Sequence, residues 1–399
     1  MSELTAVVVD VVRTASGKGK PGGALSATHP ADLLATVLQA VVERNGLETA
    51  EIDDVLVGCV SQIGEQGTNI ARTAALAAGF AESVPATTID RQCGSSQQAA
   101  TFAAHGIMAG SYDIVIAAGV ESMSRVPLGS AANGANPFGE GMRARYPEGL
   151  ANQGVGAELI AARWGFDRAT LDEYAATSHQ RAVRAAAAGE FDREILPVQV
   201  PGPDGEAVSF AADETVRPAT TAGGLARLAP AFYDERAAAR FPQIGWSITA
   251  GNSSPLTDGA SAALIMSEKK AGQLGLTPRA LLRSFAVVGD DPLFMLTGPI
   301  PATRRILKRA GMSIDDFDAF EINEAFASVP LAWAAEFHAD PAKLNPRGGA
   351  IALGHAVGSS GTRLLATLVS YLEDTGGRYG LQVMCEGGGM ANATVVERA

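Results

Sequence analysis

Cys93 stands where an apolar run ends and an alanine-rich, helix-forming run begins, in the stretch TTIDRQCGSSQQAATFAAHG. A cysteine that serves only packing is expected further along such a helix, on its apolar face. At a helix N-terminus a thiol instead meets backbone N–H groups without partners and the positive end of the helix dipole, which favour the thiolate. Because the thiolate is the form that attacks acyl groups, this position predicts that Cys93 is a nucleophile.

His355 offers a base for that thiol, and it lies in the glycine-rich stretch NPRGGAIALGHAVGSSGTR. The other four histidines lack a comparable context: His29, His105, His179 and His338. A glycine-rich loop before a helix can also cradle a phosphate. This loop has neither GxGxxG after a strand nor a Gly-Lys-Ser or Gly-Lys-Thr ending, so the nucleotide interpretation is weak. We therefore expect His355 to activate Cys93.

Two further polar positions lie at the ends of expected strands. Cys385, in LQVMCEGGGMANATVVE, is either a buried strand cysteine or a second acid/base. The glycines after it, Gly387 among them, let backbone N–H groups approach a ligand closely, as an oxyanion hole requires. Asn323, in FEINEAFA, either caps a helix or uses its amide to hold a water or a carbonyl oxygen. Cys59, within VLVGCVSQ, is interpreted as a core residue.

The elements that position these residues alternate between β-rich and Ala/Leu-rich runs, which favours a largely parallel α/β sheet. The run PADLLATVLQAVVERNG has an apolar helical face and a stop at Asn45–Gly46. The strand candidates are AVVVDVV, DDVLVGCV, DIVIAAG, ALLRSFAVVG, DAFEINEA and LQVMCEG.

A weak internal repeat divides the chain into two halves. The stretches ATVLQAVVERNGLETAEIDDVLVG and PATRRILKRAGMSIDDFDAFEI each read as helix, turn, Ile-Asp-Asp and strand. Aligning Ile52 with Ile314 gives an offset of 262 residues, which pairs Cys93 with His355. Two halves packed about a pseudo-twofold axis bring these two helix starts toward a shared centre.

The stretch between the halves is rich in Gly, Pro and Asn, with helical segments inside it, and predicts an inserted cap. We expect residues 1–121 with 251–270 to form the first half, 122–250 the inserted loop domain and 271–399 the second half.

The composition of the 399 residues, 47% hydrophobic and 19% charged, is that of a globular protein. A net charge of −12 argues against a general nucleic-acid or anionic-membrane binder, although a few cations could hold a small anion locally. Three cysteines without a CxxC pair fit a reducing compartment. The start MSELTAVVVD has an early Glu3 and no basic leader, and no apolar run approaches the roughly 18 residues of a membrane span. We expect a soluble cytoplasmic protein without a metal site.

Four motifs together resemble those of thiolases, the enzymes that cleave or form 3-ketoacyl-CoA: DRQCGSSQQA, NEAFA, GGAIALGHAVGSSG and CEGGGMANA, in that order and with roughly the family's spacing. RTASGKGKPGG, GVESMS and TAGNSSPLTDGA extend the resemblance over essentially the whole chain. It implies the thiolase fold, in which two βαβαβαββ halves form a five-layered α/β/α/β/α core with an inserted loop domain. It also implies a homodimer or a homotetramer.

The resemblance implies a role for each site residue. Cys93 becomes the acyl-cysteine, His355 activates it and helps to hold the thioester oxygen, and Cys385 is the second acid/base. Asn323 holds a water in one oxyanion hole, and the backbone N–H groups of Cys93 and Gly387 form the other. The residues implied for the CoA moiety are Arg217, Ala250, Ser254, Ala325 and Phe326. Arg217 also suits a polyphosphate, because an acidic protein needs a local cation there. Coenzyme A is a substrate, and no permanently bound cofactor is implied.

The chain departs from common thiolase patterns at a few positions. Gly354–Ala356 reads GHA where many thiolases have GHP, and CGSS replaces CGSG, but neither change removes a reacting group. Asn152–Gln153 replaces the His-Met pair of short-chain acetoacetyl-CoA thiolases, and PAFYDERAAARFPQIGWSITAGN is longer than in the compact biosynthetic type. These changes favour a degradative enzyme for bulkier acyl groups, and CGSSQQA and CEGGGMAN resemble actinobacterial thiolases, some of which act on sterol side chains.

The expected function is thiolytic cleavage of 3-ketoacyl-CoA by CoA, in fatty-acid or sterol side-chain breakdown, with β-oxidation enzymes as possible partners. The alternative in the same fold is a short-chain acetoacetyl-CoA thiolase that works in the condensing direction. A β-ketoacyl synthase is disfavoured because that class lacks Cys385. A non-catalytic subunit of a β-oxidation complex would have no need of all four polar groups, and a cysteine hydrolase predicts turnover without CoA.

Overall fold

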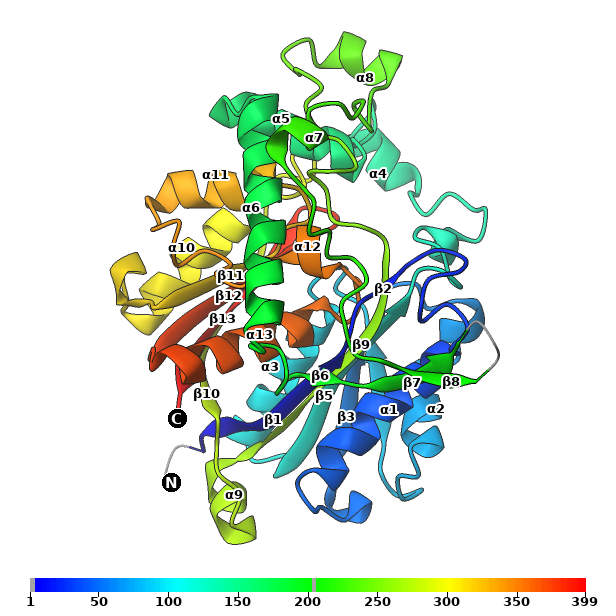
Figure 1. The fold of residues 1–399 in the computed structure, drawn as a ribbon, viewed down its shortest axis with the longest axis vertical. Helices are drawn as coiled ribbons and strands as arrows, with labels where there is room; N and C mark the ends of the chain where they lie inside the picture. The colour runs from blue at the N-terminus through cyan, green and yellow to red at the C-terminus, as the bar shows by residue number, and fades with distance from the viewer. Residues whose placement is uncertain (1–3, 203–205) are drawn as a thin grey trace.

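The computed structural model describes residues 4–202 and 206–399, so Glu3 and residues 203–205 of the inserted segment lie outside the described residues. Its centre is one sheet made of two groups of strands, one from each half of the chain, which pair with each other at their adjoining strands (Figure 1). The main path of that sheet runs β11-β12-β13-β10-β1-β9-β5-β3-β4.

The strands of the first half are β1 (Ala6–Thr14), β3 (Asp54–Gly58), β4 (Ala86–Ile89), β5 (Ile114–Ser122) and β9 (Thr257–Ser267). Neighbours β4, β3 and β5 are parallel, whereas β9 runs antiparallel to both β5 and β1. A two-residue strand, β2 (Gly17–Lys18), pairs with β9.

The strands of the second half are β10 (Ala280–Gly289), β11 (Ala319–Ile322), β12 (Tyr379–Glu386) and β13 (Met390–Arg398). Their order and directions repeat those of the first half, because β11 and β12 are parallel and β13 is antiparallel to β12 and β10. Where the first half has β4, the second has a single parallel bridge between Phe320 and Leu344. The halves join through β1 and β10, which pair only at Val7 with Leu281 and Val8 with Ala280.

Side chains of one strand alternate between two apolar layers. Val55 and Val57 face α1 (Pro30–Glu43) and α2 (Ile70–Ala77), whereas Leu56 between them faces the interior of the molecule. Strands covered on both faces are buried along their whole length, as β1 is, and are rich in apolar residues such as its valines. The predicted strands are confirmed, but β4, β9, β13 and several two- to four-residue strands were not predicted. The prediction of a largely parallel sheet is wrong, because β9 and β13 run antiparallel to both of their neighbours and β1 pairs antiparallel with β10. The sequence of β9, TDGASAALIMS, is rich in alanine, which has a weak β propensity, and its burial on both faces stabilises the strand instead.

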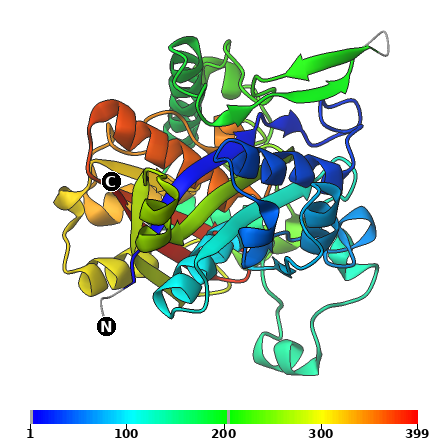
Figure 2. The same ribbon diagram turned by 90° about the horizontal axis from the view of Figure 1, so that it is seen from below.

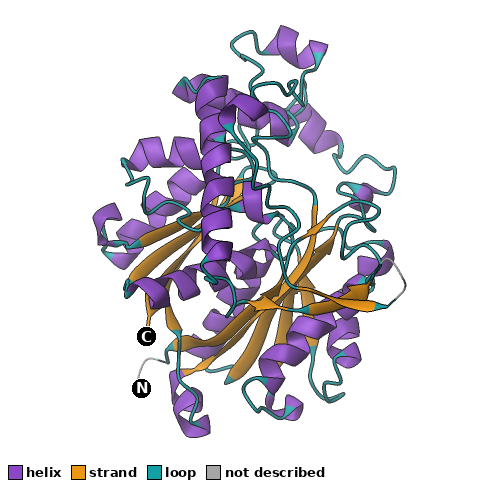
Figure 3. Cartoon of the chain, viewed as in Figure 1, coloured by secondary structure: helices purple, strands orange, loops and turns teal. Residues whose placement is uncertain are grey.

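Helices complete five layers in the order α/β/α/β/α, as the resemblance implies. α1 and α2 cover the outer face of the first half, and α10 (Pro299–Ala310) and α11 (Ser328–Phe337) cover that of the second. Between the two halves of the sheet lie α3 (Ser95–Met108) and α13 (Ser360–Thr375), packed through small and branched residues. Figure 3 shows the strands enclosed between helices.

The predicted repeat is real, but its predicted register is wrong. α3 begins at Ser95 and α13 at Ser360, and β5 begins at Ile114 and β12 at Tyr379, so both pairs are 265 residues apart and not 262. Cys93 therefore corresponds to Gly358 and not to His355. The two Ile-Asp-Asp stretches are not structurally equivalent, because Ile52 follows a 3-10 turn (η1, Thr49–Glu51), whereas Ile314 begins the equivalent turn (η4, Ile314–Asp316).

The two helix starts nevertheless meet at a shared centre. The backbone N–H of Thr362 donates a hydrogen bond of 3.1 Å to Ser96 Oγ. Gly361 approaches α3 so closely that an added Cβ would lie 2.1 Å from the backbone nitrogen of Gln97. A small residue is therefore required at this crossing.

The segment between β5 and β9 contains η3 (Ser130–Ala132), α4 (Glu140–Arg145), α5 (Gln153–Trp164), α6 (Arg168–Ala187), β6 (Ile195–Leu196), β7 (Val198–Pro201), β8 (Ala207–Phe210), α7 (Ala222–Leu225) and α8 (Glu235–Arg240). Its helices α4, α5, α7 and α8 gather at one end of the molecule, and the β7–β8 hairpin projects from the body (Figures 1 and 2). β6 pairs with β1, so part of the segment joins the first half. The predicted domain boundaries remain a prediction.

The remaining short elements are η2 (Gly64–Gln66), α9 (Glu268–Leu274) and α12 (Ala350–Leu353). Within residues 4–202 and 206–399, no helix has both the length and the apolar character needed to cross a bilayer.

Candidate active site

The structure brings together the four reactive side chains and the glycine that the sequence pointed to. Cys93 follows β4, Asn323 follows β11, and Cys385 lies near the end of β12, so all three lie at the carboxyl ends of parallel strands. Asn323 Nδ2 is 3.5 Å from His355 Nε2 and 3.5 Å from Cys385 Sγ. All four side chains are buried.

The imidazole of His355 is held in one tautomer. Its Nδ1 is 2.6 Å from Ser360 Oγ, and Ser360 Oγ donates its proton to the carbonyl oxygen of Ala356 at 2.9 Å. Because that hydroxyl has a single proton, it accepts a hydrogen bond from Nδ1–H. The proton is thus on Nδ1, and Nε2 carries the free lone pair that a general base needs.

Cys93 is a thiol in the resting site. Burial raises its pKa well above the ordinary value, and the neighbouring Cys385 and Glu386 add to the rise, while backbone hydrogen bonds from Gly387 and from Cys93 itself oppose it. Burial therefore opposes the thiolate that the helix N-terminus is predicted to favour, and in this state burial has the larger effect on the pKa of Cys93.

The partners of Cys93 are neutral as well. Burial is the main cause that lowers the pKa of His355 to about 3, and Arg363 adds to it. Burial raises the pKa of Cys385 to about 11, against hydrogen bonds from the Asn323 side chain and the Ala325 backbone. The resting site therefore holds two thiols and one neutral imidazole, so one proton acceptor lies beside two proton donors.

The turn that carries Cys93 is fixed by its own hydrogen bonds. Gln92 has a left-handed φ of 48°, a conformation that costs energy for a residue with a side chain. Asp90 Oδ1 accepts from the backbone N–H of Gln92 at 2.7 Å, and Ser95 Oγ donates to the Gln92 carbonyl at 2.6 Å. These bonds hold the strained residue directly before the nucleophile.

Glu324 anchors the loop of Asn323 to the inserted segment. Its carboxylate accepts hydrogen bonds from Tyr174 Oη at 2.9 Å and Ser178 Oγ at 2.7 Å, both on α6. It also accepts from Asn345 Nδ2 at 2.8 Å and from the backbone N–H of Ile351 at 3.1 Å. One buried carboxylate thus fixes three segments around the site.

Three further residues lie at the site, of which sequence reasoning had singled out only Gln153. Ser360 orients His355, as described above. The side chains of Gln92 and Gln153 lie beside Gly387, since a Cβ added to that glycine would be 2.9 Å from Gln92 Oε1 and 3.3 Å from Gln153 Nε2. The departure at Asn152–Gln153 was the available signal for Gln153. Asn152 itself caps α5 by accepting from the backbone N–H of Val155.

Four of the five residues expected at the CoA moiety lie on two adjoining segments. The backbone N–H of Ser254 donates to the carbonyl of Ala325 at 3.0 Å, and Ser253 forms an antiparallel bridge with Phe326. Ala250 is exposed at the start of the first segment, and Ala325 and Phe326 are buried in the second.

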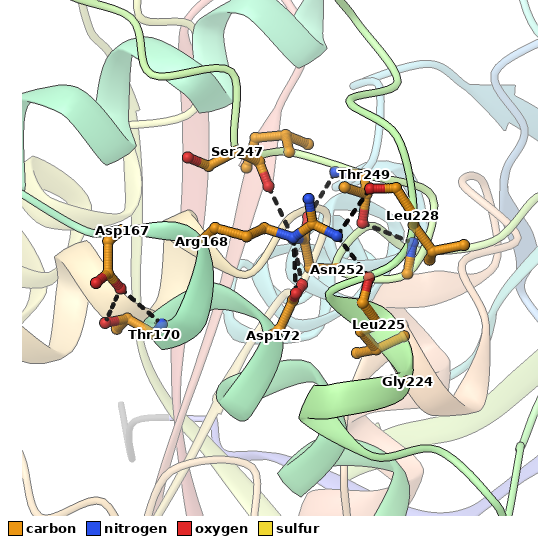
Figure 4. A network of polar contacts seen from close by, with 12 residues as sticks. Asp167, Arg168, Thr170, Asp172, Gly224, Leu225, Leu228, Ser247, Thr249 and Asn252 are labelled. Atoms are coloured by element: carbon orange, nitrogen blue, oxygen red, sulfur yellow. Dashed lines mark hydrogen bonds and ion pairs between the residues drawn. The ribbon is translucent and has the colours of Figure 1, made fainter.

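A polar network stabilises the loop that contains Ala250 (Figure 4). Arg168 Nε donates to Asp172 Oδ2 at 2.7 Å, and the other oxygen of Asp172 accepts from Asn252 Nδ2 at 2.9 Å. Asn252 Oδ1 accepts from the backbone N–H of Thr249 at 2.9 Å. The loop is thereby tied to the start of α6.

Arg217, the fifth residue, is exposed on a different loop, where its backbone N–H donates to His179 Nδ1 at 3.2 Å. Its side chain is therefore available to an anion from solvent. Across residues 4–202 and 206–399, no group of three or more His, Cys, Asp or Glu side chains could hold a metal ion.

Comparison with known proteins agrees with this arrangement. Residues 6–269 match the thiolase N-terminal domain and residues 276–398 the thiolase C-terminal domain. Steroid 3-ketoacyl-CoA thiolase FadA6 of Mycobacterium tuberculosis is 46% identical over 98% of this chain and 94% of that protein. A 3-ketoacyl-CoA thiolase of Aliivibrio salmonicida is 45% identical over 98% of this chain and 99% of that protein.

Among solved structures, the acetyl-CoA acetyltransferase of Bacillus anthracis has the same fold, with a TM-score of 0.88 and 37% identity over 100% of this chain and 99% of that one. The family matches, the two relatives and the shared fold all extend over nearly the whole chain. This chain belongs to the thiolase family and is an acyltransferase.

Proposed function

We propose that this protein cleaves 3-ketoacyl-CoA with CoA, releasing acetyl-CoA and an acyl-CoA two carbons shorter, in the breakdown of fatty acids or sterol side chains. The observation that carries the proposal is a buried site in which Asn323 Nδ2 lies 3.5 Å from both Cys385 Sγ and His355 Nε2, with Cys93 beside Cys385 and Gly387. The names of the two thiolase relatives support the substrate class.

In the first half-reaction, Cys93 gives its proton to His355 Nε2 and its sulfur bonds to the C3 keto carbon. The C2–C3 bond then breaks, and the departing acetyl-CoA carbanion takes a proton from the Cys385 thiol. Acetyl-CoA leaves, and the enzyme retains an acyl-cysteine, an imidazolium and a thiolate at Cys385. The two proton transfers thus use different residues, since His355 accepts the proton of Cys93 and Cys385 donates a proton to the carbanion. The two transfers therefore do not compete for one group.

In the second half-reaction, the Cys385 thiolate takes the proton of the incoming CoA thiol, and the CoA sulfur attacks the acyl-cysteine. The thiolate of Cys93 leaves and recovers its proton from His355, which restores all three groups. Asn323 Oδ1 is buried and has no hydrogen-bond partner among the described residues, which supports a water held there beside the developing oxyanion. The backbone N–H groups of Cys93 and Gly387 form the second oxyanion hole in this proposal.

CoA enters in this proposal along the loops of Ala250, Ser254, Ala325 and Phe326, with Arg217 beside a phosphate. Gln153 lies next to Gly387, where short-chain thiolases carry their His-Met pair, and this favours bulkier acyl groups. The 37% identity to an acetyl-CoA acetyltransferase keeps short-chain condensation as the second candidate.

Substrate turnover distinguishes these activities. We expect CoA-dependent loss of 3-ketoacyl-CoA absorbance, faster for long-chain or sterol-derived substrates than for acetoacetyl-CoA. Activity on acetoacetyl-CoA alone would establish the short-chain alternative, and loss without CoA would indicate a hydrolase. No turnover of any of these substrates would leave the non-catalytic subunit as the better description.

Substitution of single cysteines tests the roles of the thiols. Cys93→Ala should abolish turnover, and Cys385→Ala should lower kcat by about 10²-fold or more, because it removes one acid/base. Cys59 is also buried but belongs to the outer core, so Cys59→Ala is the matched control and should retain activity. Residual turnover in Cys93→Ala would disprove the covalent mechanism.

We also propose a homodimer or homotetramer in a reducing compartment such as the cytoplasm. β4 is an edge strand with partly exposed side chains, and on the neighbouring α3 Phe102 is 44% exposed, which supports association at this edge. The chemistry needs Cys93 and Cys385 as thiols, which supports the compartment. Sedimentation velocity of the purified chain measures the assembly directly.

A further inference from the structure

Glu386, the residue after Cys385, is a fully buried carboxyl group outside the mechanism described above. Neither of its oxygen atoms has a hydrogen-bond partner among the described residues. Because side chains of a strand alternate between faces, Glu386 points away from the side of Cys385. A buried polar group without partners needs an explanation in terms of function or environment.

The carboxyl group of Glu386 lies against the turn that carries the nucleophile. A Cβ added to Gly94 would be 2.1 Å from Glu386 Oε1 and 2.8 Å from Asn392 Nδ2. Asn392 Nδ2 donates to the carbonyl of Gly94 at 3.0 Å, so it supports the same turn. Only glycine at position 94 leaves room for the carboxyl group beside Cys93.

The charged groups that act on Glu386 belong to the turn that carries Cys93. Arg91, whose buried Nε has no hydrogen-bond partner among the described residues, favours the carboxylate, whereas Asp90 disfavours it. Burial is the largest influence and raises the pKa of Glu386 to about 8. The group is therefore an uncharged carboxylic acid at neutral pH, with a proton available for donation.

The charge of Glu386 acts directly on the nucleophile. A negative charge there raises the pKa of Cys93, in the same direction as burial and Cys385. An uncharged carboxylic acid fills the same space without that repulsion. A substitution that removes the charge of Glu386 but keeps the shape of its side chain therefore tests the charge separately from the packing.

We propose that Glu386 is a positioning residue that supports the Cys93 turn as an uncharged carboxylic acid, and that its ionisation holds Cys93 in the thiol form. The proposal deepens the proposed function, since it rests on Cys93 as the nucleophile. Ionisation of Glu386 then limits how far the reactivity of Cys93 rises at alkaline pH.

The test is the pH dependence of Cys93 alkylation by iodoacetamide, located by peptide mass spectrometry, in wild type, Glu386→Gln and Glu386→Asp. Below pH 7 we expect wild type and Glu386→Gln to react alike, because neither carries a charge at this position. Above pH 8 Glu386→Gln should react about tenfold faster, equivalent to a Cys93 pKa lower by about one unit. Glu386→Asp keeps an ionisable group and should retain the wild-type profile.

Three results separate the possibilities. Superimposable profiles for wild type and Glu386→Gln would overturn the role of Glu386. A Glu386→Asp profile that matches Glu386→Gln would show a packing effect and would also overturn it. Alkylation of wild-type Cys93 no faster than that of Cys59 would instead count against the proposed function, because Cys93 would not be a nucleophile.

Discussion

At the scale of residues, the groups that react in the proposed mechanism, Cys93, His355 and Cys385, are all uncharged before substrate binds. A buried charge without a partner costs several kcal/mol, whereas a thiol and a neutral imidazole cost far less. In the proposed mechanism, burial of Cys93 therefore keeps its thiol protonated at rest, and charge develops only when a substrate carbonyl is attacked. His355 can serve this chemistry because Ser360 holds its Nδ1 proton in place.

Replacement of Ser360 tests the importance of that tautomer. Ser360→Ala removes the acceptor for Nδ1–H, so the imidazole can turn or move its proton to Nε2. We expect kcat/KM to fall by about tenfold or more, a part of the roughly 10²–10⁴-fold that general-base catalysis contributes. Ser360→Thr keeps the hydroxyl and should restore most of the activity; equal losses in both variants would mean that packing, not the hydroxyl, matters.

At the scale of elements, the site exists because α3 and α13 begin close together between the two halves of the sheet. Several glycines allow this approach: an added Cβ at Gly58 would lie 2.3 Å from the Ser96 nitrogen, and one at Gly119 would lie 2.3 Å from the Gly358 carbonyl oxygen. Backbone packed this closely leaves no space for side chains. The glycines at these contacts thus allow the starts of α3 and α13 to lie close together.

Two helical glycines provide a matched test of this packing. Gly361→Ala in α13 should lower the free energy of unfolding by about 1–3 kcal/mol, since the added methyl group overlaps the backbone of α3. Gly272→Ala in α9 meets nothing within 4 Å and should raise stability by up to about 1 kcal/mol through helix propensity. Urea unfolding measures both, and a neutral Gly361→Ala would show that the crossing can adjust.

At the scale of the whole molecule, buried polar groups join the inserted segment to the core. Arg13 on β1 donates to Glu194 Oε1 at 2.7 Å and to Asp213 Oδ1 at 2.7 Å, and both acids belong to the inserted segment. Glu324 makes the corresponding connection from the second half to α6. Removal of one partner leaves the other buried and unpaired, so these contacts specify how the segment sits over the site.

Buried histidines predict that the folded molecule loses stability in acid. Burial is the main cause that lowers the pKa of His179 on α6 to about 4, against an ordinary value of 6.5. Between those values the unfolded chain binds a proton that the folded chain does not, so stability falls as pH falls, by up to about 1.4 kcal/mol per pH unit. His355 acts in the same direction.

Urea unfolding at pH 7 and pH 5 checks this prediction. In His179→Gln, the loss of unfolding free energy between the two pH values should be about 1–2 kcal/mol smaller than in wild type. The double variant with His355→Gln should reduce the loss further. An unchanged loss in both variants would place the acid sensitivity in other groups.

The sequence by itself determined the fold class, because apolar runs with helix and strand periods are local signals and its motifs resemble those of one family. It also pointed to Cys93, His355, Cys385, Asn323 and Gly387, whose neighbours in sequence mark turns and helix starts. Only the tertiary structure decided the register of the repeat, the thiol state of Cys93, and the positions of Ser360, Gln153 and Glu386. Those properties depend on burial and on contacts between residues far apart in the chain, which local sequence patterns do not encode.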